Sequence, residues 1–109
     1  MSNYLFIESR DPFESPDVKF VEQTAVTMRQ QGHTVTVFLV QNGVLATRRA
    51  AKSTYLDRLS EAQVALLADD FSLRERGIQN AELRPGIQPT AIDDLVGLLL
   101  QDHTKAIWH

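Results

Sequence analysis

Two adjacent aspartates, Asp69 and Asp70, stand between an apolar run and a short polar segment that Gly77 ends. The apolar run Val64–Ala68 is predicted to be a buried strand, and the polar segment a short helix. In an open α/β sheet, ligands bind where a strand hands over to a helix. The two carboxylates could therefore act as a general base, as ligands of a hard cation or as an acidic patch for a partner. The alternative is helix capping, which is compatible with either use.

Two further loops are predicted to bring polar side chains to the same edge. Arg10 follows the strand predicted over Tyr4–Ile7, and Asn42 follows the strand predicted over Thr34–Val40. The carboxyl ends of parallel strands lie at one edge of a sheet, so these loops could converge on a single crevice. The predicted crevice for a ligand or partner has four members: Arg10, Asn42, Asp69 and Asp70. The planar guanidinium of Arg10 suits a carboxylate or phosphate. Its alternative is an ion pair with a nearby acid: Asp11, Glu14 or Asp69.

The composition excludes several kinds of site and partner. The chain has 109 residues, of which 43% are hydrophobic and 23% charged, and residues 1–109 are predicted to form a single domain. It has no cysteine, which excludes a disulfide, a thiolate metal site and a thiol nucleophile within the chain. The net charge of −3, with one short basic run around Arg48, predicts no nucleic-acid partner. No membrane-spanning run or secretory signal is recognised, so a cytoplasmic location without a membrane partner is expected.

Motifs for metals and cofactors do not occur in the sequence. The histidines His33, His103 and His109 do not have the spacing of a metal-ligand pair on a helix. The five glycines form neither the GxGxxG nor the GxxxxGK[ST] phosphate-binding pattern. The sequence therefore predicts no metal site and no cofactor, and it assigns no catalytic residue.

Strand-like and helix-like segments alternate along the chain. The predicted strands are Tyr4–Ile7, Thr34–Val40, Val64–Ala68, a short one near Ile87, and Lys105–Trp108. The predicted helices run from Pro16 to Gly32 and over Val44–Lys52, Tyr55–Ala62, Phe71–Arg76 and Thr90–Asp102. This alternation indicates an α/β fold, a three-layer α/β/α sandwich with a mostly parallel sheet of about five strands.

The order of these segments, the motif SLRERGI at Ser72–Ile78 and the segment DDLVGLLLQDHTKAIWH at Asp93–His109 resemble the DsrE/DsrF/DsrH (TusBCD) sulfur-relay family. The turn Asn42-Gly43-Val44 also matches a turn common in that family. The resemblance implies a DsrE-like fold, assembly into dimers, trimers or hexamers, and a role in cytoplasmic sulfur trafficking. Active members carry persulfide sulfur on a cysteine at the end of the third strand. Counting back from Gly77, this position is Asp69.

A carboxylate cannot form a persulfide, so the sequence favours a binding protein over an enzyme. We expect a non-catalytic DsrE-like protein without a cysteine for persulfide transfer, acting as a homo-oligomer or an accessory subunit with a protein partner in sulfur trafficking. One alternative is a carboxylate-based or metal-assisted enzyme for small molecules that uses Asp69 and Asp70. A second alternative is a purely structural oligomer. Its interface would use some of the larger aromatic side chains: Tyr4, Phe13, Tyr55, Phe71 and Trp108.

Overall fold

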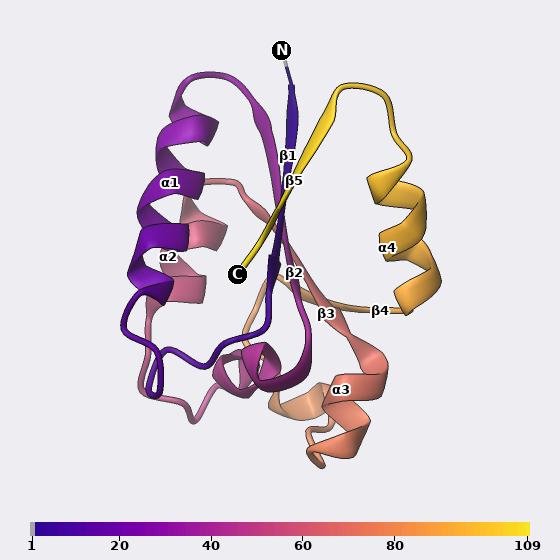
Figure 1. The fold of residues 1–109 in the computed structure, drawn as a ribbon. Coiled ribbons are helices and arrows are strands. Elements are labelled where there is room, and N and C mark those ends of the chain that lie inside the picture. Colours follow the sequence, from indigo (N-terminus) through magenta and orange to yellow (C-terminus); the bar gives the residue numbers. More distant parts are fainter. Residues whose placement is uncertain (1) are drawn as a thin grey trace.

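The computed structural model describes residues 2–109, which form one sheet with helices on both faces (Figure 1). The strands are all parallel and lie in the order β4-β3-β2-β1-β5. They are β1 (Asn3–Glu8), β2 (Thr34–Leu39), β3 (Ala65–Asp69), β4 (Ile87–Thr90) and β5 (Thr104–Trp108). The α-helices are α1 (Val18–Gln30), α2 (Tyr55–Glu61), α3 (Asp70–Glu75) and α4 (Ile92–Leu99). Two 3-10 segments are η1 (Gln41–Thr47) and η2 (Asn80–Glu82). The predicted α/β/α fold is confirmed.

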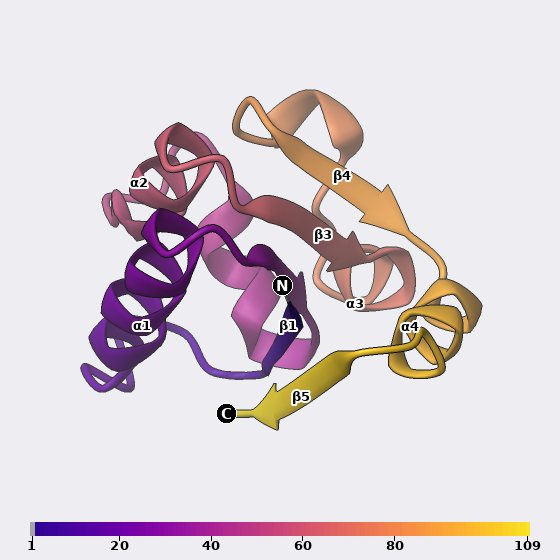
Figure 2. The same cartoon turned by 90° about the horizontal axis from the view of Figure 1, so that it is seen from above.

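Two apolar layers hold the helices to the sheet. α1 and α2 cover one face and α4 covers the other (Figures 1 and 2). The larger core lies under α1 and α2 and includes Phe6 and Val21, which have no exposed surface. Alternate residues of a strand point to opposite faces, so Ile7 and Phe38 are buried with Leu95 of α4 instead. β1 and β2 are therefore apolar on both faces, as their continuous apolar runs predict.

The connections after β2 and β3 leave the sheet in different directions. β2 leads through η1 to α2 on the α1 side, whereas β3 leads into α3, which lies at the lower end of the sheet toward α4 (Figure 1). Leu39 of β2 pairs with Ala68 of β3, so the two strands end at the same edge. Ligand crevices of open parallel sheets lie outside the carboxyl ends of the strands. The carboxyl ends of β2 and β3 therefore locate the candidate site. No helix within residues 2–109 is long and apolar enough to cross a bilayer.

The helix predicted over Val44–Lys52 is wrong. The chain forms η1 there, ends it early, and is extended at Arg48. The hydroxyl of Thr47 donates to the carbonyl of Val44 at 2.6 Å, and such a local bond competes with α-helical pairing. The carbonyls that follow are bound from outside the segment, because the guanidinium of Arg84 donates to two of them. Tertiary hydrogen bonds thus replace the predicted helical ones.

Two predicted helix starts also differ from the structure. Thr90, predicted to cap the last helix, ends β4 instead, and its hydroxyl donates to the carbonyl of Gln88 at 2.9 Å. α4 therefore starts later than predicted and also ends before the predicted Asp102. α1 starts at Val18 rather than at Pro16, because a turn occupies the preceding residues.

Candidate functional site

Asp69 ends β3 and caps the N-terminus of α3. Its Oδ2 accepts hydrogen bonds from the backbone N–H of Ser72 at 3.1 Å and from the Ser72 hydroxyl at 2.7 Å. The Ser72 Oγ in turn accepts from the backbone N–H of Gln41 at 2.9 Å. This chain of bonds joins the start of α3 to the start of η1. One oxygen of the Asp69 carboxylate thus has the capping role that the sequence offers as an alternative.

The other oxygen of Asp69 has no hydrogen-bond partner among residues 2–109. Asp69 is only 6% exposed, and its Oδ1 is buried and unpaired. A buried acceptor without a donor destabilises a fold by about 1–3 kcal/mol. Asp69 lines a hollow of about 300 Å³, which we call the Asp69 hollow. Its apolar walls are Val40, Phe71, Ile92, Leu95 and Trp108.

Asp70 lies on a different surface from its neighbour. Its carboxylate is 3.5 Å from the guanidinium of Arg74, one turn later in α3. It lines a separate hollow of about 590 Å³ together with Gly77 and Asn80. This pair is largely exposed, so it contributes little to stability. The two adjacent aspartates are therefore not arranged to act on one ligand.

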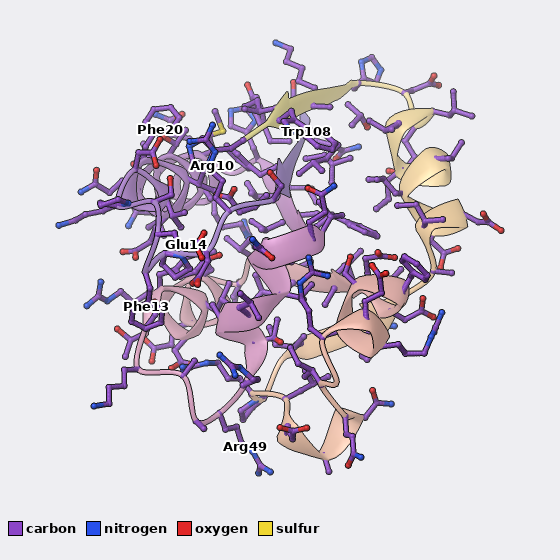
Figure 3. The ribbon with its side chains drawn as sticks, turned by 60° about the horizontal axis from the view of Figure 1, so that its bottom comes forward. Arg10, Phe13, Glu14, Phe20, Arg49 and Trp108 are labelled. Carbon is purple, nitrogen blue, oxygen red and sulfur yellow. The ribbon has the colours of Figure 1, made fainter. Side chains whose placement is uncertain are left out.

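Arg10 and Asn42 line a third hollow, of about 240 Å³. The Arg10 guanidinium lies 3.5 Å from the Ser15 hydroxyl and 3.6 Å from the carboxylate of Asp17, which is none of its three predicted acidic partners. The Oδ1 of Asn42 accepts from Nε of Arg76 at 3.2 Å and from its Nη2 at 3.0 Å. Figure 3 shows Arg10 on the α1 side of the molecule, opposite α4. The four predicted residues thus lie beyond the same ends of the strands, but they line three hollows.

A polar cluster at the ends of β1 and β5 is the feature that the sequence did not predict. Glu8 is fully buried, and its carboxylate oxygens lie 2.8 and 2.9 Å from Nδ1 of His109. The Nε2 of His109 lies 3.1 Å from Asp17, whose carboxylate also bonds to the Ser15 hydroxyl. Burial raises the pKa of Glu8, and the hydroxyl of Ser15 lowers the pKa of Asp17. An imidazole between two carboxylates can donate to both when it is charged.

The sequence did not predict this cluster because its members are far apart along the chain. Glu8 and His109 are 101 positions apart, and they meet because β5 returns to pair with β1. No local pattern marks such a pairing. Among residues 2–109, no set of three or more His, Asp or Glu side chains is arranged to hold a metal ion.

Comparisons with known proteins agree with this architecture. The family model described as DsrE/DsrF-like matches residues 2–105. The fold is similar to that of the ychN protein from E. coli, with a TM-score of 0.84 and 20% identity over 98% of this chain and 100% of that one. It is also similar to the protein of unknown function MTH1491 from Methanobacterium thermoautotrophicum, with a TM-score of 0.83 and 17% identity over the full length of both chains. At such identities the similarity shows the fold alone. The curated proteins give no match.

Proposed function

Because the chain belongs to the DsrE/DsrF-like family, which is associated with sulfur metabolism, we propose that it acts by binding rather than by carrying sulfur. The observation that carries the proposal is Asp69. The resemblance implies a persulfide-bearing cysteine at this position, and the chain has no cysteine anywhere. The Asp69 carboxylate has no sulfur to donate, and one of its oxygens is held by Ser72. The proposed role is that of a subunit in a homo-oligomer or in a mixed assembly.

The outer side of α4 supports an assembling role. Six large apolar side chains in this region are between 42% and 78% exposed, and we call them the α4 face: Phe71, Ile92, Val96, Leu99, Leu100 and Trp108. Ile92 and Val96 are one helical turn apart, and Ile92 lines the Asp69 hollow together with Phe71 and Trp108. A continuous exposed apolar surface of this kind is typical of an interaction site. We infer that a second copy of the chain, or a related subunit, covers the part of this face formed by Val96, Leu99 and Leu100, which does not line the Asp69 hollow.

The five aromatic residues predicted for an interface lie in three places. Tyr4 is partly buried and packs against the main core. Tyr55 is 5% exposed and belongs to the main core, so it cannot contribute to an interface. Phe71 and Trp108 are exposed on the α4 face, whereas Phe13 lies on the α1 side of the molecule (Figure 3). The α4 face is therefore the surface on which the proposal depends.

The enzymatic alternative receives no support from the positions of the acids. Asp69 and Asp70 line different hollows, and the described residues hold no set of acids and histidines arranged for a metal. A carboxylate pair acting on one substrate needs both groups at one place. The cytoplasmic location and the sulfur-trafficking partner that the resemblance implies belong to our proposal.

Light scattering on the purified chain tests the assembling role. We expect the wild type to be larger than a monomer. Leu100→Asp should shift it toward the monomer, because a charge cannot be buried without a partner. Gln23→Asp, which adds the same charge at an exposed position of α1, should leave the size unchanged. A monomeric wild type that also recovers no partner from a cytoplasmic extract would contradict the proposal.

Incubation with a persulfide donor tests the absence of sulfur transfer. After removal of the donor, the intact mass of the chain should be unchanged, and no sulfur should pass to an added thiol acceptor. Turnover of the donor by the purified chain alone would show that the binding role is wrong.

A further inference from the structure

The Asp69 hollow has an unusual combination of walls. Its apolar walls include the aromatic side chains of Phe71 and Trp108. The charged residues that line it are both acids, Asp69 and Glu75, and among the described residues no lysine, arginine or histidine lines it. Its volume of about 300 Å³ suits a small organic molecule. An anion would be repelled by two carboxylates, so the hollow favours a ligand that is apolar and positively charged.

The unpaired oxygen of Asp69 indicates where the charge of such a ligand would lie. Oδ2 already accepts two hydrogen bonds from Ser72, whereas the buried Oδ1 accepts none from residues 2–109. A neutral hydrocarbon would leave this acceptor unpaired. An ammonium group would supply a donor, and a hydrogen bond between charged partners is stronger than one between neutral groups. The nearby aromatic rings would add cation–π attraction.

We propose that the Asp69 hollow binds a small primary amine with an apolar body, in its ammonium form. The ammonium donates to Oδ1 of Asp69, and the hydrocarbon part packs against Phe71 and Ile92. Since Oδ1 is covered in the free chain, a wall side chain must turn aside. Trp108, 65% exposed, and Phe71, 56% exposed, are free enough to do so. This inference rests on the proposed binding function and names the class of ligand.

The chain offers a direct probe of this site. Trp108 is the only tryptophan of the sequence, so intrinsic tryptophan fluorescence reports on the wall of the hollow alone. Phenylethylamine is titrated into the full chain, with 2-phenylethanol and phenylacetate as its neutral and anionic counterparts. We expect saturable binding of the amine, binding of the alcohol at least about tenfold weaker, and no binding of the acid. Equal affinities for the three, or no saturation by the amine up to about 10 mM, would overturn the proposal.

Two variants locate the binding. Asp69→Asn keeps an oxygen that can cap α3 but removes the charge, and it should weaken amine binding at least about tenfold. Glu61→Gln removes an equal charge from an exposed position of α2 and should leave the affinity unchanged. An unchanged affinity in Asp69→Asn would refute the site. Because sulfur transfer and assembly are measured separately, a failure of amine binding alone leaves the proposed function standing.

Discussion

Replacing Gly43 by alanine should disrupt the close backbone contact between η1 and β1. A Cβ at this position would overlap the carbonyl oxygen of Glu8 and lie 3.1 Å from its carbonyl carbon. Neither the backbone of Gly43 nor the carbonyl of Glu8 can move easily. The Glu8 carbonyl accepts from the Val40 N–H at 3.0 Å, and the Gly43 N–H donates to the Val40 carbonyl at 2.9 Å. The added methyl group therefore meets hydrogen-bonded backbone rather than a flexible side chain.

The magnitude follows from this geometry. Inserting a methyl group into a packed region usually destabilises a fold by about 1–3 kcal/mol, and rigid backbone on both sides places Gly43→Ala at the upper end, about 3 kcal/mol. A small protein loses about 1–3 kcal/mol of unfolding free energy per molar urea. The urea midpoint should therefore fall by about 1–3 M. The comparison needs one fixed protein concentration, because assembly also stabilises.

Gly97→Ala is the matched control for this prediction. Gly97 lies within α4, and an added Cβ there meets nothing within 4 Å. Alanine should stabilise this helix by about 0.5–1 kcal/mol. If Gly43→Ala unfolds at the same urea concentration as Gly97→Ala, the inferred close approach of η1 to β1 is wrong.

Substitutions at three further positions test other parts of the structure. Arg84→Ala should lower the free energy of unfolding by about 3 kcal/mol in urea melts. The Arg84 guanidinium is only 7% exposed, and it donates to the Ala46 carbonyl at 2.9 Å and to the Asp57 carboxylate at 2.7 Å. A loss below about 0.5 kcal/mol would contradict these buried bonds. Asp69→Ala should destabilise by about 1–2 kcal/mol through loss of the cap, whereas Asp69→Asn should stay close to wild type; equal losses would exclude the capping role. Burial raises the pKa of Glu8 above 4.5, so the folded state binds its proton more tightly than the unfolded state. The stability that wild type has relative to Glu8→Gln, measured by denaturation at a series of pH values, should therefore decline as the pH rises from about 4.5 through the raised pKa; a difference that grows with pH would refute the assignment.

Local patterns predicted most of the fold because the central strands β1 and β2 are buried on both faces. The end of β2, residues 37–39, must be apolar at every position to lie between two helical layers, and this leaves a continuous apolar run in the sequence. The order of the strands in the sheet could not be predicted from local patterns. The pairing of β5 with β1 joins segments about as far apart as the chain allows, and nothing in either segment specifies its neighbour. The Glu8–His109 contact therefore emerged only from the structure.

The sequence predicted where Asp69 lies in the sheet, but not which side chains share a hollow with it. Asp69 does lie at the hand-over from strand to helix, as the apolar run before it indicates. Its neighbour Asp70 belongs to the helix, where side chains follow a different period from that of a strand. The two carboxylates consequently line different hollows. Arg10 lies 3.6 Å from the carboxylate of Asp17, the residue just before α1, and this contact joins two segments that the sequence did not link.

The two carboxylate oxygens of Asp69 differ in role: one is structural, and the other is available to a ligand in our proposal. Capping requires a single acceptor, which a serine or an asparagine side chain also provides. Oδ2 satisfies that requirement through its bonds to Ser72. Oδ1 adds nothing to the cap, and as a buried acceptor without a donor it opposes folding by about 1–3 kcal/mol. A donor from a bound molecule would remove this penalty and gain the full strength of a charged hydrogen bond. The carboxylate therefore favours a bound state over the free one, which asparagine at the same position, with an N–H group in place of the second oxygen, would not do.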